Sequence, residues 1–149
     1  MSEEHSYQLE SRWVRDKIVT IEIEGKEPFE VATPPDFWAD APAGVLSPED
    51  LFLASAVSCY GVSLSGVAKR YHGEFSDFRV RAEAPLTQGE FGWEFERIDM
   101  QVTITVPSQK DKKRITKAAE RAHKYCVVSN SMKCPVNLQY EITIKRSIL

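Results

Sequence analysis

Residues 47–68 read SPEDLFLASAVSCYGVSLSGVA, and this stretch decides the fold. Ser47 is a good helix cap, and Pro48 suits the first helical position. Two acidic residues follow, and acidic side chains stabilise the positive end of a helix dipole. After them the stretch carries no charge. It therefore predicts a long helix that is apolar on all sides.

The uncharged run is close in length to a membrane-spanning helix. It nevertheless contains several serines and two glycines, and the flanking segments have the alternating pattern of amphipathic strands. Small residues suit close packing, so we expect the buried central helix of a soluble domain. A chain of 149 residues rarely covers every face of such a helix. A second subunit is expected to cover part of it, which predicts a homodimer.

Alternation of apolar and polar residues marks the strands. Ser108, with Asp111 three positions later, resembles a capping box that opens a second helix with an apolar stripe from Ile115 to Cys126. No repeat or Gly/Ser-rich linker divides the chain, so residues 1–149 are expected to form a single domain. The element order predicts an α+β fold in which a mainly antiparallel sheet wraps around the long buried central helix. The expected strands lie at residues 18–24, from residue 29, and at 78–84, 98–106 and 136–144.

Charge and cysteine content narrow the functional classes. Lys and Arg number 19 against 22 Asp and Glu, a net charge of −3, so neither nucleic acid nor an anionic membrane is an expected partner. The acidic N-terminus, MSEEH, is unlike a secretory signal. Three cysteines lack the even number and dense spacing of a secreted scaffold. We expect a cytoplasmic protein with reduced thiols, in which any disulfide is transient and catalytic.

The cysteines are the candidates for chemistry. Cys59 lies inside the uncharged helix, Cys126 at the end of the second helix, and Cys134 just before Pro135. The absence of a Cys-x-x-Cys pair argues against a thioredoxin motif or a zinc knuckle. His123 and Cys126 share a helix face, but two ligands at this spacing are common by chance, and no metal or other cofactor is expected. Composition alone would make Cys59 a small buried apolar residue.

Residues 47–59 and residues 122–130, AHKYCVVSN, resemble two motifs of the OsmC/Ohr family of thiol peroxidases, the osmotically inducible and organic hydroperoxide resistance proteins. In the first motif a Pro-Glu segment leads into a helical cysteine, and in the second a helix-end cysteine is followed by Ser-Asn. The order of strands and helices is similar over essentially the whole chain. The resemblance implies an intertwined homodimer with active sites at the subunit interface.

The resemblance also implies hydroperoxide reduction. Cys59 matches the peroxidatic cysteine, whose thiolate attacks the peroxide and becomes a sulfenic acid. Cys126 matches the resolving cysteine, which condenses with it to a disulfide that a dithiol, lipoyl-type in some of the family, reduces again. Burial disfavours a thiolate, so Cys59 needs a neighbouring cation. By the resemblance Arg15 supplies it, and Glu49 holds the arginine.

Two of these assignments stay open. Arg12 is the alternative to Arg15 as the cation beside Cys59, and the pattern places both arginines in the loop before the first long strand. The glycine-rich loop that often surrounds the family arginine is absent. Val127 follows Cys126 where the family usually has proline. Cys134, which does precede a proline, is therefore the alternative resolving cysteine.

The substrate preference and the presence of turnover stay open as well. Aromatic residues favour an apolar pocket, which indicates organic hydroperoxides as preferred substrates. Without turnover, the same pocket would make the chain a non-catalytic small-ligand-binding member of the fold, and a third alternative keeps the thiols for another redox task. The aromatic residues concerned are Phe37, Trp38, Phe91, Trp93 and Phe95.

Overall fold

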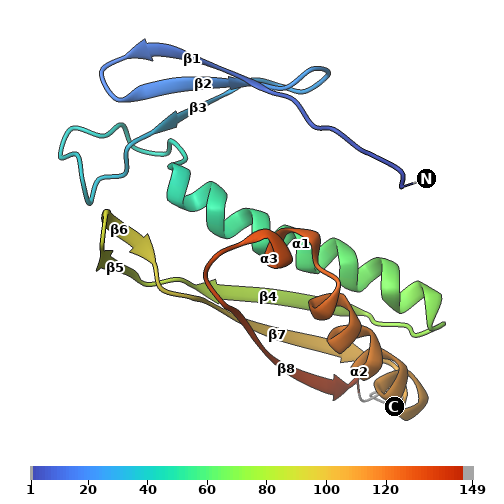
Figure 1. The fold of residues 1–149 in the computed structure, drawn as a ribbon. Helices are drawn as coiled ribbons and strands as arrows, with labels where there is room; N and C mark the ends of the chain where they lie inside the picture. The colour runs from blue at the N-terminus through green and yellow to red at the C-terminus, as the bar shows by residue number, and fades with distance from the viewer. Residues whose placement is uncertain (1, 146–149) are drawn as a thin grey trace. The chain divides into compact units, whose positions relative to one another are not determined.

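The computed structural model describes residues 2–145, and within them the chain forms eight strands and three helices (Figure 1). Their internal contacts divide the chain into two compact units, one up to Phe52 and one from Leu53 onward. Helix α1 (Pro48–Arg70) begins in the first unit and continues through the second. The single domain over residues 1–149 stays a prediction.

The first unit holds a three-stranded antiparallel sheet with the order β1-β2-β3. The predicted strands at residues 18–24 and from residue 29 are confirmed. The loop placement of Arg12 and Arg15 is wrong, because Arg12 lies within the first strand and Arg15 ends it. Every residue of that strand is exposed, so it has no apolar face that the sequence pattern can reveal. The strands are β1 (Glu10–Arg15), β2 (Ile18–Glu22) and β3 (Phe29–Ala32).

The second unit contains a three-stranded sheet with the order β4-β7-β8 and a separate hairpin of β5 and β6. Strand β7 alternates almost perfectly, with five apolar side chains buried on one face. Its pairing with β4 is antiparallel and its pairing with β8 is parallel. A parallel neighbour requires a crossover, which α2 supplies. The strands are β4 (Asp77–Glu83), β5 (Leu86–Gly89), β6 (Gly92–Phe95), β7 (Ile98–Val106) and β8 (Val136–Ile144).

Both predicted helix caps are confirmed. Ser47 Oγ accepts a hydrogen bond from the Asp50 backbone N–H at 3.1 Å, and Asp50 accepts one from the Ser47 N–H at 2.9 Å. Ser108 caps α2 (Gln109–Lys124) in the same way, accepting from the Asp111 N–H at 3.1 Å. A short helix, α3 (Val127–Ser131), follows α2 directly. Local sequence therefore sets where these helices begin.

Helix α1 buries one face rather than all of them. Ala56, Tyr60, Leu64 and Ala68 are buried, whereas Val62 on the opposite side is 71% exposed. Among the described residues, α1 is the one helix long and apolar enough to cross a membrane, a criterion that core helices of soluble proteins also meet. An uncharged helical face therefore lies uncovered in the single chain.

Candidate active site

Packing of α1 against α2 brings two of the three cysteines together. The Tyr60 hydroxyl donates a hydrogen bond to the Ala119 carbonyl oxygen at 3.2 Å and ties α1 to α2. Burial, with a smaller effect from Tyr140, raises the pKa of the Tyr60 phenol, so it remains a neutral donor. One residue earlier on α1, the Cys59 thiol donates a hydrogen bond to the sulfur of Cys126.

The backbone turn after α2 shapes the surroundings of Cys126, which is the N-terminal cap of α3. Its sulfur accepts a hydrogen bond from the Ser129 hydroxyl at 3.4 Å, and the backbone N–H groups of Ser129 and Val128 act on it electrostatically. Burial raises the pKa of this thiol, whereas Ser129, Val128 and the Cys59 thiol lower it through their donor groups. The lowering effects outweigh burial, so the pKa of Cys126 lies below its ordinary value. The site therefore favours a thiolate at Cys126.

The two thiols differ in access to solvent. Cys59 is half-buried, whereas Cys126 is 0% exposed. Both are free thiols in this structure, as is Cys134. A small molecule arriving from solvent therefore meets Cys59 before Cys126.

Ser129 is a site residue to which the sequence motif gave no role. The Ser-Asn pair after Cys126 was its only signal, and both side chains have structural tasks. Ser129 donates to the Cys126 sulfur, and the Asn130 amide donates to the Lys124 carbonyl oxygen at 3.1 Å. Val127, which replaces the family's proline, is the first residue of α3 and is 73% exposed. A proline is optional at a first helical position, so the replacement leaves the Cys126 geometry intact.

Replacing Ser129 by alanine is expected to raise the pKa of Cys126, because the thiolate loses its hydroxyl donor. The pKa is read from thiolate ultraviolet absorbance during a pH titration, in a Cys59→Ser, Cys134→Ser background where Cys126 is the single cysteine. A lowered thiol pKa stabilises the folded state at pH values above the thiol pKa of the unfolded chain, and this stabilisation is lost as pH falls through the folded-state pKa. Ser129→Ala is therefore also expected to reduce stability at alkaline pH.

Ser131→Ala is the matched control for this titration. Its hydroxyl donates to the Val127 carbonyl oxygen at 2.8 Å, so the change is the same but the sulfur keeps its donors. An unchanged Cys126 pKa in Ser129→Ala, or an equal rise in Ser131→Ala, contradicts the assigned role of Ser129.

Arg15 and Glu49 belong to the first unit, whereas Cys59 and Cys126 belong to the second. Arg12 lies 3.8 Å from both Glu10 and Glu22, whereas Arg15 makes no ion pair within residues 2–145. Glu49 Oε2 is buried and has no hydrogen-bond partner among the residues that the structure describes. Glu49 is therefore a carboxylate in need of a donor, and Arg15 is a cation without a carboxylate.

The remaining residues singled out by sequence lie outside this thiol pair. Cys134 is half-buried between α3 and β8 and is not among the groups that hydrogen-bond to Cys126. His123 Nδ1 is buried without a hydrogen-bond partner in the described part of the chain, where no three His, Cys, Asp or Glu residues gather as metal ligands. Phe91, at the β5–β6 turn, is 96% exposed.

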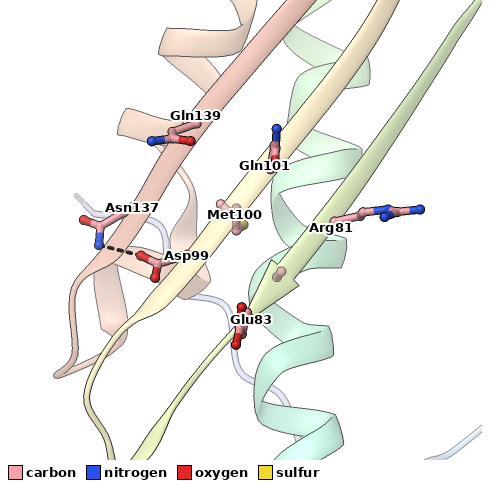
Figure 2. A pocket seen from close by; sticks show the side chains of 8 residues that line it. Arg81, Glu83, Asp99, Met100, Gln101, Asn137 and Gln139 are labelled. Atoms are coloured by element: carbon pink, nitrogen blue, oxygen red, sulfur yellow. Dashed lines mark hydrogen bonds between the residues drawn. The ribbon is translucent and has the colours of Figure 1, made fainter.

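A cavity of about 480 Å³ in the second unit lies on the polar face of the β4-β7-β8 sheet (Figure 2). Asp99 there accepts hydrogen bonds from Asn137 at 2.9 Å and from Arg97 at 2.7 Å, and these bonds lower its pKa. No cysteine lines this cavity, and its central carboxylate already has partners. It is therefore separate from the thiol site.

The structure places the chain among α+β proteins that hold two thiols in contact. Comparison with known proteins identifies the family. A family model described as OsmC-like protein matches residues 41–141, and the chain belongs to this family. The predicted α+β, OsmC/Ohr-like fold is confirmed.

The chain is similar to the following three proteins, among others. The uncharacterised protein YmaD of Bacillus subtilis is 23% identical over 95% of this chain and 96% of its own. An OsmC-like protein of unknown function from Vibrio cholerae has a TM-score of 0.82 at 16% identity, covering 93% of this chain and 100% of its own. An organic hydroperoxide resistance protein from Legionella pneumophila has a TM-score of 0.70 at 20% identity, covering 94% and 99%.

Proposed function

We propose that this protein is a cytoplasmic thiol-dependent peroxidase that reduces hydroperoxides, organic ones in preference. The hydrogen bond between Cys59 and Cys126 carries the proposal, because it brings together two cysteines that are 67 positions apart in sequence. Membership of the OsmC-like family supports a redox role, and solved relatives of the same fold are named organic hydroperoxide resistance proteins.

In the proposed reaction the Cys59 thiolate attacks the terminal peroxide oxygen. The O–O bond breaks, the alkoxide takes a proton and leaves as the alcohol, and Cys59 becomes a sulfenic acid. The Cys126 thiolate then attacks the Cys59 sulfur, the S–O bond breaks as the disulfide forms, and the departing hydroxide takes a proton from solvent and leaves as water. A dithiol reductant, lipoyl-type as the family allows, returns two electrons by thiol–disulfide exchange.

The different burial of the two thiols supports this division of roles. The attacking sulfur must be reachable by the peroxide, and Cys59 is the more accessible of the pair. The resolving sulfur needs to be a thiolate close to Cys59, and the hydrogen bonds at Cys126 favour that form.

Thiol counting tests the proposal. The fully reduced protein receives one equivalent of cumene hydroperoxide or hydrogen peroxide per chain, and free thiols are counted under denaturing conditions. We expect rapid loss of two of the three thiols to one Cys59–Cys126 disulfide, faster with cumene hydroperoxide, and recovery with dihydrolipoamide. Slow or absent thiol loss would identify the chain as a non-catalytic binding member of the fold.

Arg15→Ala is expected to slow peroxide reduction by at least about tenfold, because the Cys59 thiolate loses a stabilising cation. Glu49→Ala is expected to act in the same direction but less, since Glu49 would only orient the arginine. The rate of the first step is measured by stopped-flow mixing with cumene hydroperoxide. Arg12→Ala is the matched control, because Arg12 already has Glu10 and Glu22 as neighbours. A slow Arg12→Ala beside a normal Arg15→Ala reverses the assignment.

The proposal includes a homodimer with active sites at the interface. It is supported by the uncovered, uncharged face of α1, formed by Ala54, Ser58, Val62 and Ser65. Such a face is typical of an interface between copies, because small side chains let helices approach closely.

Val62→Asp tests this dimer. Val62 is 71% exposed in the single chain, so the substitution is expected to change the free energy of unfolding of an isolated subunit by no more than about 0.5 kcal/mol. At an interface it would bury a charge and cost several kcal/mol, which dissociates the dimer. Sedimentation velocity is expected to show a dimer for wild type and for Val62→Ala, and a folded monomer for Val62→Asp. A monomeric wild type contradicts the dimer.

A further inference from the structure

The second unit has a groove between the C-terminal half of α1 and the end of α2. Two adjoining cavities of about 380 and 250 Å³ form it, and both are lined by Val67, Arg70 and Tyr125. None of the cysteines lines either cavity. The larger cavity has a volume within the range of small-molecule sites. The remaining lining residues are Ser63, Gly66, Tyr71, Arg121 and Ala122.

Two arginines from different helices face this groove, and neither makes an ion pair with any residue that the structure describes. The Arg121 guanidinium lies over the Tyr125 ring at 4.7 Å, and Lys124 Nζ lies 5.6 Å from the same ring. Stacking on an aromatic ring holds Arg121 in place while leaving its N–H donors available. No carboxylate lines the groove, so its charge is positive.

An arginine in the last turn of a helix has an ordinary explanation, since a cation there stabilises the negative end of the dipole. That explanation serves Arg70 in α1 and Arg121 in α2 separately. It does not explain why the two side chains line one cavity.

The rest of the lining is apolar or small. Val67 and the rings of Tyr71 and Tyr125 form apolar walls. Gly66 and the buried Ala122 line the second cavity, and their small size leaves space in it. A Cβ atom added at Gly66 would meet nothing within 4 Å, so there is space above that backbone. The groove therefore combines cationic donors with an apolar bed.

We propose that this groove binds a small-molecule monocarboxylate with an apolar body. The carboxylate pairs with Arg70 and Arg121, whose planar donors match its two oxygens. The apolar body lies along Val67 and the two tyrosine rings. The nearby end of α1 carries partial negative charge, which favours a singly charged carboxylate over a phosphate dianion. The site is independent of the thiol chemistry and uses no residue of the peroxidase mechanism.

Calorimetric titration of the reduced full-length protein tests the site. Dodecanoate and naphthoate serve as alkyl and aryl carboxylates, and dodecanol and naphthylmethanol as their uncharged counterparts. We expect the acids to bind and the alcohols to bind at least about tenfold more weakly, with acid binding weakened by added salt. A preference between the two acids identifies an alkyl or an aryl body.

Variants locate the binding. Arg70→Gln and Arg121→Gln are each expected to weaken carboxylate binding about tenfold, because each removes a charge-assisted hydrogen bond. Arg79→Gln, on the exposed face of β4, is the matched control and leaves binding unchanged. Gly66→Leu fills the open space and blocks binding of the apolar body without a backbone clash.

Unfolding curves confirm that each variant is folded before binding is compared. The proposal is overturned if the wild type binds neither acid, if acids and alcohols bind equally, or if the two arginine variants bind as tightly as Arg79→Gln. Cys59→Ser is expected to bind both acids like wild type. The outcome of the peroxide assays therefore does not decide the outcome of this one.

Discussion

Cys59→Ser is expected to lose peroxide reduction by at least about a thousandfold. A serine hydroxyl stays protonated near neutral pH, and its oxygen cannot supply the polarisable anion that attacks the O–O bond. Loss of a nucleophile is among the largest single-residue effects on an enzyme. The rate is measured as consumption of cumene hydroperoxide in the presence of dihydrolipoamide.

The fold of this variant should be unaffected, because serine is close to cysteine in size and Cys59 is only half-buried. The introduced serine hydroxyl can still donate to the Cys126 sulfur, so the unfolding transition serves as the control for structural damage. Full activity in Cys59→Ser would refute the proposed peroxidase mechanism altogether.

Cys126→Ser is expected to consume about one peroxide per chain and then stop. Without the resolving thiolate, the sulfenic acid at Cys59 has no partner with which to condense. Intact-protein mass spectrometry should show one added oxygen, and a sulfenate-specific reagent should label Cys59. Turnover with dihydrolipoamide should fall strongly, because reduction then depends on direct attack by the external thiol.

Cys134→Ser is the matched control, since it removes another half-buried thiol that is not hydrogen-bonded to Cys126. It is expected to turn over nearly as fast as wild type. If Cys134→Ser accumulates sulfenic acid while Cys126→Ser continues to cycle, the resolving cysteine is the one that precedes proline. The choice between Cys126 and Cys134 is thus decided by which variant retains the added oxygen.

Elements with strong local signals were predictable. The caps at Ser47 and Ser108 are side chain to backbone hydrogen bonds within four residues, so the sequence contains every atom that forms them. Strand β7 was predictable because one of its faces is buried and the other is polar. Strand β1 was missed because none of its residues is buried. The β5–β6 hairpin was missed as well, since its strands are short and Phe91 at its turn is exposed.

The candidate active site was also predictable only in part. The resemblance of residues 47–59 and 122–130 to family motifs identified the candidate residues Cys59, Cys126, Glu49 and Arg15 from their types and order alone. It could not give Ser129 a role, because a hydrogen bond to Cys126 depends on the backbone turn between α2 and α3. Nor could it distinguish Arg12 from Arg15, since the neighbours Glu10 and Glu22 of Arg12 come together only when β1 pairs with β2.

The sequence by itself determined the α+β class and the long uncharged helix, and it proposed Cys59 and Cys126 as the candidate cysteines, because these follow from periodicity, capping and motif. The tertiary structure alone decided that Cys59 meets Cys126, that β8 pairs in parallel with β7, and that Arg70 and Arg121 line one groove. Contacts of this kind join residues far apart in the chain. They depend on how helices pack against each other and against a sheet, which no local pattern encodes.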